Sequence, residues 1–281
     1  MLRVYRRSNF LSGVSFLAFR HKVGVDMGRL ALRVQYNGSN FSGWQSQAGR
    51  RTVQSSLENA LSFVADEPIK VVCAGRTDAG VHADGQVVHF DTNAIRTDYS
   101  WVFGTNTKLP PDISIQWARN VPETFHARFS AISRSYRYLV YNEPIRSALF
   151  HKRATWEHRK LDIALMQSAA KYWIGRHDFS SFQAKGCQAS SPVREIQAFD
   201  VSQELDCIVF SITANAFLQH MIRNFAGVLF DIGCGKREIS WANDVLMYRD
   251  RSLGGVTAEP DGLYLVHVGY PEEFSIYTES D

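Results

Sequence analysis

One short segment of small residues, Cys73–His82, carries the side chains best suited to chemistry; it reads Cys-Ala-Gly-Arg-Thr-Asp-Ala-Gly-Val-His. Gly75 and Gly80 permit a tight backbone and the close approach of another molecule. Arg76 and Asp78 are two positions apart, so in extended backbone their side chains lie on the same side and can meet. A cationic neighbour keeps a carboxylate ionised, which suits one that attacks a substrate or stabilises developing positive charge. The spacing alone is more typical of an ordinary loop with a surface ion pair.

Two predicted strands flank this segment and complete a β-α-β-β order in the first half of the chain. Alternating apolar residues over 29–36 predict a strand. Apolar residues at three- and four-residue spacing after Thr52 predict a helix with that threonine as its N-cap. Runs rich in β-branched residues over 69–74 and 85–90 predict the two flanking strands.

The same order recurs in the second half, with strands expected at 136–141, 193–201 and 207–213 and helices at 161–173 and 217–232. Two such units predict an α+β fold of two pseudo-duplicated halves. We expect a mostly antiparallel sheet, helices on the outer face and a central active-site cleft. The expected domains are a leader over 1–28, an N-terminal half over 29–130 and a C-terminal half over 131–281, joined near 120–131.

The composition is that of a globular protein, with 45% apolar and 21% charged residues in a chain of 281. The longest apolar stretch, Phe10–Phe19, is about half the length of a bilayer-spanning helix, so no membrane association is expected. The net charge of +3 belongs to the leader, which holds five basic residues and one acid, whereas the remaining chain holds 26 basic and 27 acidic residues. The leader is either a transit peptide or an upstream extension before an internal start at Met27.

The four cysteines form no C-x-x-C pair and the nine histidines show no paired ligand spacing. We therefore expect no metal and no disulfide framework, which suits a reducing cytoplasm.

Positive charge is concentrated in residues 126–160, which hold eight basic side chains and two acids, with aromatic residues interleaved. Guanidinium groups and aromatic planes together suit phosphate contact and base stacking, so this stretch predicts RNA binding. The alternative is a solvated strand face whose acidic partners come from elsewhere in the fold.

Residues 74–83 resemble the active-site signature of the TruA family of tRNA pseudouridine synthases. Further segments resemble other motifs of that family, in the same order along the chain: 36–45, 86–90, 125–129, 134–138, 215–224 and 262–265. The resemblance implies an isomerase that converts uridine to pseudouridine at tRNA positions 38 to 40, in the anticodon stem-loop. The base is detached from C1′, turned and rejoined through C5, without cofactor or metal. The resemblance also implies a homodimer whose partner is tRNA.

The resemblance assigns roles to five residues. Asp78 is the catalytic aspartate, which attacks C1′ as nucleophile or stabilises its positive charge. Arg76 and Arg223 are expected to pair with this aspartate, and Arg76 also helps to hold the flipped-out nucleotide. Tyr136 stacks on the target base, although acting as a proton acceptor would require a perturbed pKa. Leu263 packs under the base. Each of three residues also has an ordinary structural interpretation: Tyr136 as a half-buried strand tyrosine, Arg223 as a charge on a helix surface, and Leu263 as a core leucine.

A base inside a stem must leave the stack before it can react, which costs a few kcal/mol, so contacts with RNA are needed to offset it. The expected RNA-facing strip is Phe125, His126, Ala127, Arg128 and Phe129. Further candidates are Arg96 and the polar loop Gly186, Cys187, Gln188, Ala189 and Ser190. Asp84, an acid near the expected cleft, has no assigned role.

Two other functions compete with this interpretation. One is a catalytically inactive RNA-binding protein of the same fold, against which an intact Asp78, Arg76 and Tyr136 argue. The other is a glycoside hydrolase, which requires a second acid at a suitable separation from Asp78, and the neighbouring carboxylates offer no clear partner.

Overall fold

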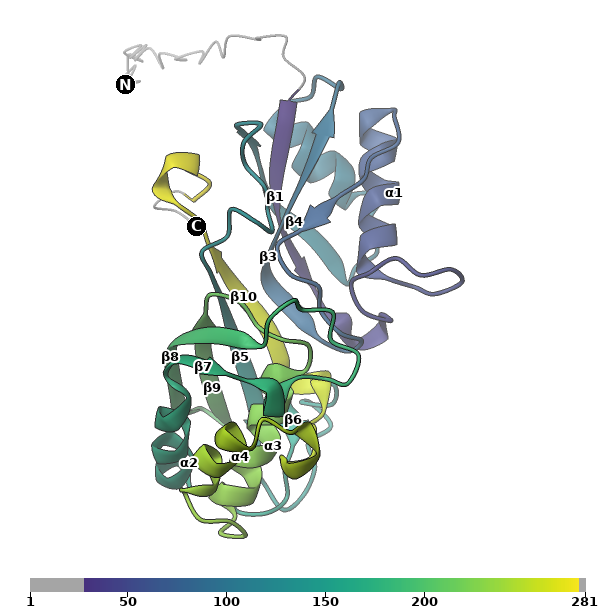
Figure 1. Cartoon of the computed structure of the whole chain (residues 1–281). Helices are drawn as coiled ribbons and strands as arrows, with labels where there is room; N and C mark the ends of the chain where they lie inside the picture. Colours follow the sequence, from purple (N-terminus) through teal and green to yellow (C-terminus); the bar gives the residue numbers. More distant parts are fainter. Residues whose placement is uncertain (1–27, 278–281) are drawn as a thin grey trace, which may run out of the picture.

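Ten strands form one open, mostly antiparallel sheet in this computed structural model, which describes residues 28–277 (Figure 1). The main path has the order β4-β1-β3-β10-β5-β9-β8-β7, while β2 pairs with β3 and β6 pairs with β5. The strands are β1 (Gly28–Tyr36), β2 (Val72–Cys73), β3 (His82–Thr92), β4 (Ile113–Val121), β5 (Ser133–Tyr141), β6 (Thr155–Trp156), β7 (Gly175–Asp178), β8 (Val193–Glu204), β9 (Cys207–Ala214) and β10 (Leu263–Gly269).

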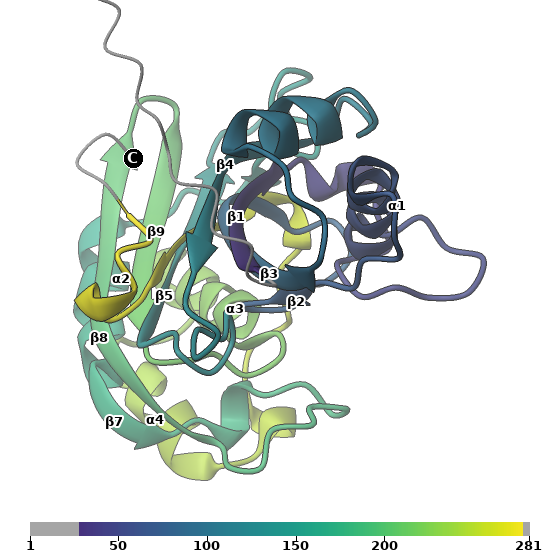
Figure 2. The same cartoon turned by 90° about the horizontal axis from the view of Figure 1, so that it is seen from above.

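Four α-helices pack on this sheet: α1 (Val53–Ala65) in the first half, and α2 (Ile163–Ala170), α3 (Met221–Gly233) and α4 (Trp241–Tyr248) in the second. Seen from above, α1 lies on the far side of β1 and β3 from the other three helices (Figure 2). Short helical turns cover Gly38–Asn40, Ser100–Gly104, Lys171–Trp173, Ser180–Phe182, Arg251–Leu253, Pro260–Gly262 and Glu272–Phe274. Within residues 28–277, no helix has the length and apolar character needed to cross a bilayer.

The expected fold class, a mostly antiparallel α+β sheet with few helices, is confirmed. Helix α1 begins where the sequence predicted it, and the Thr52 hydroxyl accepts a bond from the Ser55 N–H as an N-cap. The residues Val53, Leu57 and Leu61 form its buried face at three- and four-residue spacing.

Several elements differ from the sequence prediction. The strand expected over 69–74 shrinks to β2, because the backbone beyond Cys73 turns into the loop that carries Asp78. The helix expected from residue 217 begins only at Met221, because His220 adopts the left-handed conformation (φ 63°) and interrupts helical geometry. Strands β4, β7 and β10 and helix α4 were not predicted at all.

Strand β10 connects the two halves of the sheet. It runs parallel to β3, with Leu265 opposite Ala83, and antiparallel to β5, with Leu265 opposite Tyr136. Its residues come from the end of the chain, whereas β3 and β5 come from the first and second predicted halves. The division of the chain at residue 130 stays a prediction. The leader over 1–27 lies outside the described residues, and Gly28, expected as its last residue, begins β1 opposite Thr92.

A loop between β1 and α1 supports the segment that carries Asp78. Gly43 (φ 88°) lies against that segment: a Cβ atom there would lie 2.9 Å from the Thr77 carbonyl oxygen and 3.1 Å from the Ala79 nitrogen. The next residue, Trp44, donates its N–H to that same carbonyl at 3.0 Å. Glycine is therefore required both for its backbone angle and for the close approach.

We predict that Gly43→Ala destabilises the protein by more than the roughly 1–2 kcal/mol that a left-handed residue costs, because the methyl group also displaces the Asp78 segment. Catalytic rate should fall with it. Gly49→Ala is the matched control, since Gly49 also has positive φ (69°) but has no atom within 4 Å of a built Cβ. Urea unfolding of both variants measures the difference, and equal losses of stability would contradict the packing argument.

Candidate active site

Asp78 lies in an eight-residue loop, 74–81, that is anchored at several points to the N-terminal half. The Ala74 N–H donates to the Val87 carbonyl, and the Gln86 side chain donates to the Gly75 carbonyl at 2.6 Å. The hydroxyls of Tyr36 and Thr77 are 2.8 Å apart in the buried interior. These contacts fix the backbone on both sides of Asp78 while its own side chain stays 29% exposed.

The partners of the Asp78 carboxylate come from the other half of the chain. Arg223 Nη1 lies 3.7 Å from Asp78 Oδ2, and His220 Nε2 lies 3.4 Å from the same oxygen. Both residues stand at the beginning of α3, where the free N–H groups of a helix favour negative charge. The structure thus brings Arg223 to Asp78, as the resemblance implied. The sequence prediction did not include His220.

Arg76 does not make the ion pair with Asp78 that its spacing suggested. Its side chain is exposed, and within residues 28–277 no ion pair joins it to Asp78. The Val81 N–H donates to the Asp78 carbonyl and closes a turn after the aspartate. Two-residue spacing did not bring the two side chains together, and Arg76 is exposed.

Arg223 is held by its own helix and by the segment before β10. Its Nε donates to the Ala258 carbonyl at 2.7 Å, and the Ala258 N–H donates back to the Arg223 carbonyl. One turn further along α3, Gly227 allows the close approach of this segment, because a Cβ there would lie 1.7 Å from the Val256 carbonyl oxygen. With only 14% of its side chain exposed, Arg223 presents a fixed charge to Asp78.

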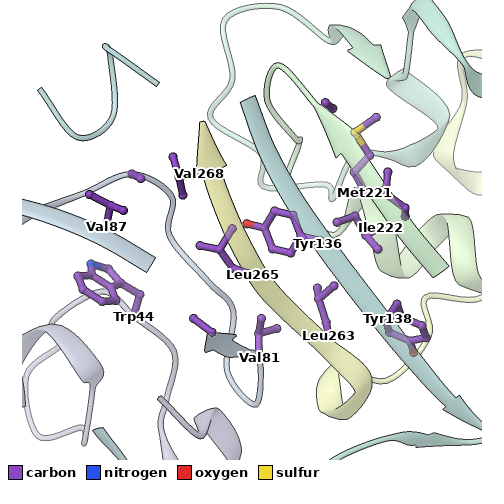
Figure 3. Close-up of a cluster of buried hydrophobic side chains, with 14 of the residues drawn as sticks. Trp44, Val81, Val87, Tyr136, Tyr138, Met221, Ile222, Leu263, Leu265 and Val268 are labelled. Atoms are coloured by element: carbon purple, nitrogen blue, oxygen red, sulfur yellow. The ribbon is translucent and has the colours of Figure 1, made fainter. Parts of the chain in front are cut away.

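Tyr136 and Leu263 stand on the adjacent strands β5 and β10 (Figure 3). Both are largely buried, and the Tyr136 ring packs edge-on against Phe217 at 5.1 Å between ring centres. The Tyr136 hydroxyl lies 3.8 Å from where a Cβ on Gly75 would stand, so the ring reaches the loop that carries Asp78. The phenol of Tyr136 thus lies near the Asp78 loop, with Leu263 on the neighbouring strand.

The environment of Tyr136 does not make it a base. Burial raises the pKa of its phenol well above the ordinary value, the positive charge of Arg134 opposes this, and the negative charge of Asp78 adds to it. The hydroxyl therefore stays protonated at neutral pH. This geometry favours the stacking role over that of proton acceptor.

Arg134 is a residue that the sequence placed only within a basic stretch. Its guanidinium donates to four carbonyls in four segments, those of Ala74, Arg128, Ala131 and Asn215. These link the start of the Asp78 loop, the predicted RNA-facing strip and the approach to α3. All four acceptors are neutral, so its positive charge stays uncompensated beside the site. Its position two residues before Tyr136 on β5, and therefore on the same face, was the available signal.

The strip 125–129 divides into buried and exposed positions. Phe125 and Ala127 are fully buried, so their side chains are not available to RNA, which corrects the expectation for these two residues. Phe125 instead packs against Tyr270. Phe129 is 75% exposed, and its ring stacks on His126 at 4.3 Å.

Arg128 is exposed beside Phe129, with its guanidinium 5.5 Å from that ring's centre. A cationic and aromatic pair thus stands where Arg134 links the strip to the Asp78 loop.

The other RNA candidates differ in their distance from Asp78. The loop with Gly186, Gln188, Ala189 and Ser190 exposed and Cys187 half-buried adjoins the approach to α3, because the Ala184 N–H donates to the Gln219 carbonyl. Arg96 lies beyond the far end of β3 and donates to the Val64 carbonyl at the end of α1. Because α1 begins beside the Asp78 loop and rises about 1.5 Å per residue, Arg96 lies roughly 17 Å further along the helix axis.

Part of the basic stretch 126–160 does not form an RNA-binding surface, because acidic side chains neutralise it. Arg137 pairs with Glu204, and Arg159 pairs with Glu157 at 2.7 Å and Asp231 at 3.1 Å. These charges are thus compensated by acids inside and outside the stretch, and the net charge of +6 is not one continuous surface.

Asp84 is likewise accounted for by ordinary contacts on β1, because it accepts bonds from the side chains of Arg33 and Gln35. Across residues 28–277, no cluster of three or more His, Cys, Asp or Glu side chains is suited to hold a metal ion.

An antiparallel α/β sheet that brings an arginine-paired aspartate beside a buried tyrosine is the arrangement expected of a pseudouridine synthase. A sequence model described as tRNA pseudouridine synthase matches residues 32–130 and 169–271. A protein of Nitrosococcus oceani named tRNA pseudouridine synthase A is 56% identical over 248 residues, which cover 88% of this chain and 96% of that protein. The protein of the same name in Pseudomonas aeruginosa is 56% identical over 260 residues, covering 92% and 91%. The chain belongs to the tRNA pseudouridine synthase family, and the resemblance seen in its motifs is confirmed.

We predict that a double-mutant cycle separates the roles of the two arginines. Asp78→Asn and Arg223→Ala should show a coupling free energy of unfolding of about 0.5–1 kcal/mol, as expected for a partly buried ion pair. Asp78→Asn and Arg76→Ala should show none within error, since these side chains form no ion pair. Urea unfolding of the single and double variants measures both cycles. A larger coupling with Arg76 than with Arg223 would contradict the assignment.

Proposed function

We propose that this chain isomerises uridine to pseudouridine at tRNA positions 38 to 40, in the anticodon stem-loop, with Asp78 as the catalytic residue. Isomerisation of uridine in tRNA follows from membership of the family. The observation that carries the proposed role of Asp78 is its position: a partly exposed carboxylate that faces Arg223 at 3.7 Å and lies near Tyr136.

The geometry supports a reaction at C1′ of the flipped nucleotide. Asp78 attacks C1′, or stabilises its positive charge, as the bond from C1′ to N1 breaks and its electron pair stays on the uracil ring. The ring turns and C5 bonds to C1′; where Asp78 has bonded to C1′, that bond breaks in this step and its electron pair returns to the carboxylate. The proton on C5 is then released to solvent, and N1 takes up a proton from solvent. Tyr136 stacks on the uracil and Leu263 packs against it, so the detached ring is retained during the turn.

The nucleotide must first leave its stem, at a cost of a few kcal/mol. Arg128 and Phe129 can offset part of this cost. They are exposed on the strip that Arg134 links to the Asp78 loop, and they offer one charge for a phosphate and one ring for a base. The exposed guanidinium of Arg76 fits the proposed role of holding the extruded nucleotide. The loop 186–190 lies on the other side of the approach to α3 and completes the proposed RNA-facing rim.

The remaining expectations belong to the same proposal. The enzyme acts without metal or cofactor, as a homodimer in the cytoplasm, with tRNA as its partner. The alternative, an inactive RNA-binding protein of this fold, would have no need of a carboxylate with Arg223 fixed against it.

We predict that unmodified tRNA transcripts tritiated at uridine C5 lose tritium when incubated with the protein, because C5 exchanges its proton for the bond to C1′. Asp78→Asn should slow the release by about 10³-fold or more, as expected when a nucleophile is removed. Asp84→Asn is the matched control, since this carboxylate pairs with Arg33 away from Asp78 and should release tritium normally.

Transcripts with cytidine at positions 38 to 40 test the proposed position and should release no tritium. Release from these transcripts would refute the position and leave the chemistry standing. Binding without any release would support the inactive alternative, and free uracil would indicate hydrolysis.

We predict that Arg128→Ala raises the KM for tRNA, has little effect on kcat, and lowers the slope of log affinity against log salt by about one. The reason is that the exposed guanidinium is available to one phosphate and does not touch the reacting atoms. Lys171→Ala is the control, an exposed cation at the end of α2. Filter binding from low to moderate salt gives both slopes, and an unchanged slope for Arg128→Ala would show that this residue contacts no phosphate.

A further inference from the structure

His220 contacts the catalytic carboxylate but has no part in the mechanism above. Its Nε2 lies 3.4 Å from Asp78 Oδ2, the oxygen that also faces Arg223. Within the described residues, neither side chain makes a hydrogen bond to Asp78, so both act on its carboxylate as close polar neighbours at Oδ2.

The backbone of His220 indicates that this contact is maintained against local preference. The residue stands at φ 63° and ψ 2°, a left-handed conformation that a side chain with a Cβ adopts at a cost. It occupies the N-cap position of α3, yet its ring makes no capping bond to the helix. The ring instead faces the Asp78 carboxylate of the other half of the chain. Such strain in a non-glycine residue is typical of functional sites.

We propose that His220 is a positioning residue of this active site: together with Arg223 it orients the Asp78 carboxylate for its reaction at C1′. This inference rests on the proposed role of Asp78 as the catalytic residue. It gives the imidazole a function through the carboxylate and not through the RNA.

The charge state of the imidazole matters to this role. Burial lowers the pKa of His220, Asp78 opposes this shift, and the cations Arg223 and Arg251 add to it. Arg223 stands on the same helix, and Arg251 belongs to the short turn after α4, where it donates to Asn224 and Thr257. The ring is thus mostly neutral at pH 7, with its Nε2 3.4 Å from Asp78 Oδ2.

Protonation of the ring would weaken catalysis. A second cation on Oδ2 stabilises the free carboxylate more than the state in which its charge has been given to C1′, so attack becomes slower. Catalysis should therefore decline as the pH falls through the lowered pKa of His220, which lies below the ordinary histidine value of about 6.5.

Single-turnover tritium release and KM measurements on His220→Ala and His220→Asn, from pH 5 to 8, test this inference. His220→Ala should lower kcat by about 10- to 100-fold at pH 7.5, because the carboxylate is less well oriented, with KM for tRNA within about twofold of wild type. His220→Asn should recover most of the rate, since asparagine accepts the left-handed backbone and its amide can donate to Oδ2. It should also lack the decline that the wild type shows when histidine protonates. Gln219→Ala, an exposed neighbour, should match the wild type.

The outcomes separate this inference from the proposed function. A raised KM with unchanged kcat in His220→Ala would overturn it and identify an RNA contact. Wild-type kcat together with a changed free energy of unfolding would also overturn it, because the role would then be structural. If Asp78→Asn is inactive while both His220 variants behave as wild type, the positioning role fails and the proposed function stands. If Asp78→Asn stays active, the proposed role of Asp78 fails first.

Discussion

The contact of the Asp78 carboxylate with Arg223 and His220 from the other half of the chain is the constraint on which the rest of the structure depends. The loop that carries Asp78 is anchored to Tyr36, Trp44 and Gln86, all in the first half. Its partners, Arg223 and His220, belong to the start of α3. A separation of 3.4–3.7 Å is maintained only if the two halves hold a fixed relative position. The sheet provides this, because β3, β10 and β5 are joined by backbone hydrogen bonds.

Two arginines near the site donate their hydrogen bonds to uncharged carbonyl groups. Arg134 donates to four carbonyls and Arg223 to one, and none of these bonds goes to a carboxylate. Their positive charge consequently remains available near the place where a polyanion must enter. Arg137 and Arg159 show the opposite arrangement, since each is paired with acids away from Asp78. A basic stretch in the sequence thus divides into structural and functional charges by the acceptor that each side chain meets.

Local pattern was sufficient for much of the fold. The helix after Thr52 and the strands at β1, β8 and β9 follow from capping and apolar periodicity. Strand β10 was not predicted, and its place in the sheet could not be read from local pattern, because its partners lie more than a hundred residues away in the sequence. The shift of the α3 start to Met221 was hidden for another reason, since the conformation of His220 is set by packing and not by its own propensity.

The active site also combines residues that the sequence motifs identified with contacts that only the folded structure shows. The motifs led to Asp78, Tyr136, Arg223 and Leu263, which the fold gathers around β5, β10 and the start of α3. Spacing alone failed for Arg76, because two-residue spacing does not fix where the ends of the side chains lie: the Asp78 carboxylate faces the start of α3, whereas Arg76 is exposed. Burial within the strip 125–129 was equally invisible, since an alternation of core and surface in irregular backbone has no fixed period.

The place of β10 in the sheet also sets the order in which the protein can be completed. The ribosome makes β3 and β5 long before residues 263–269, yet these two strands meet only through β10. Until that last strand emerges, the nascent chain keeps exposed strand edges of the kind that favour aggregation. A chain that stops before residue 263 therefore lacks the strand that joins β3 to β5, and with it the sheet connection that holds Asp78 against the start of α3.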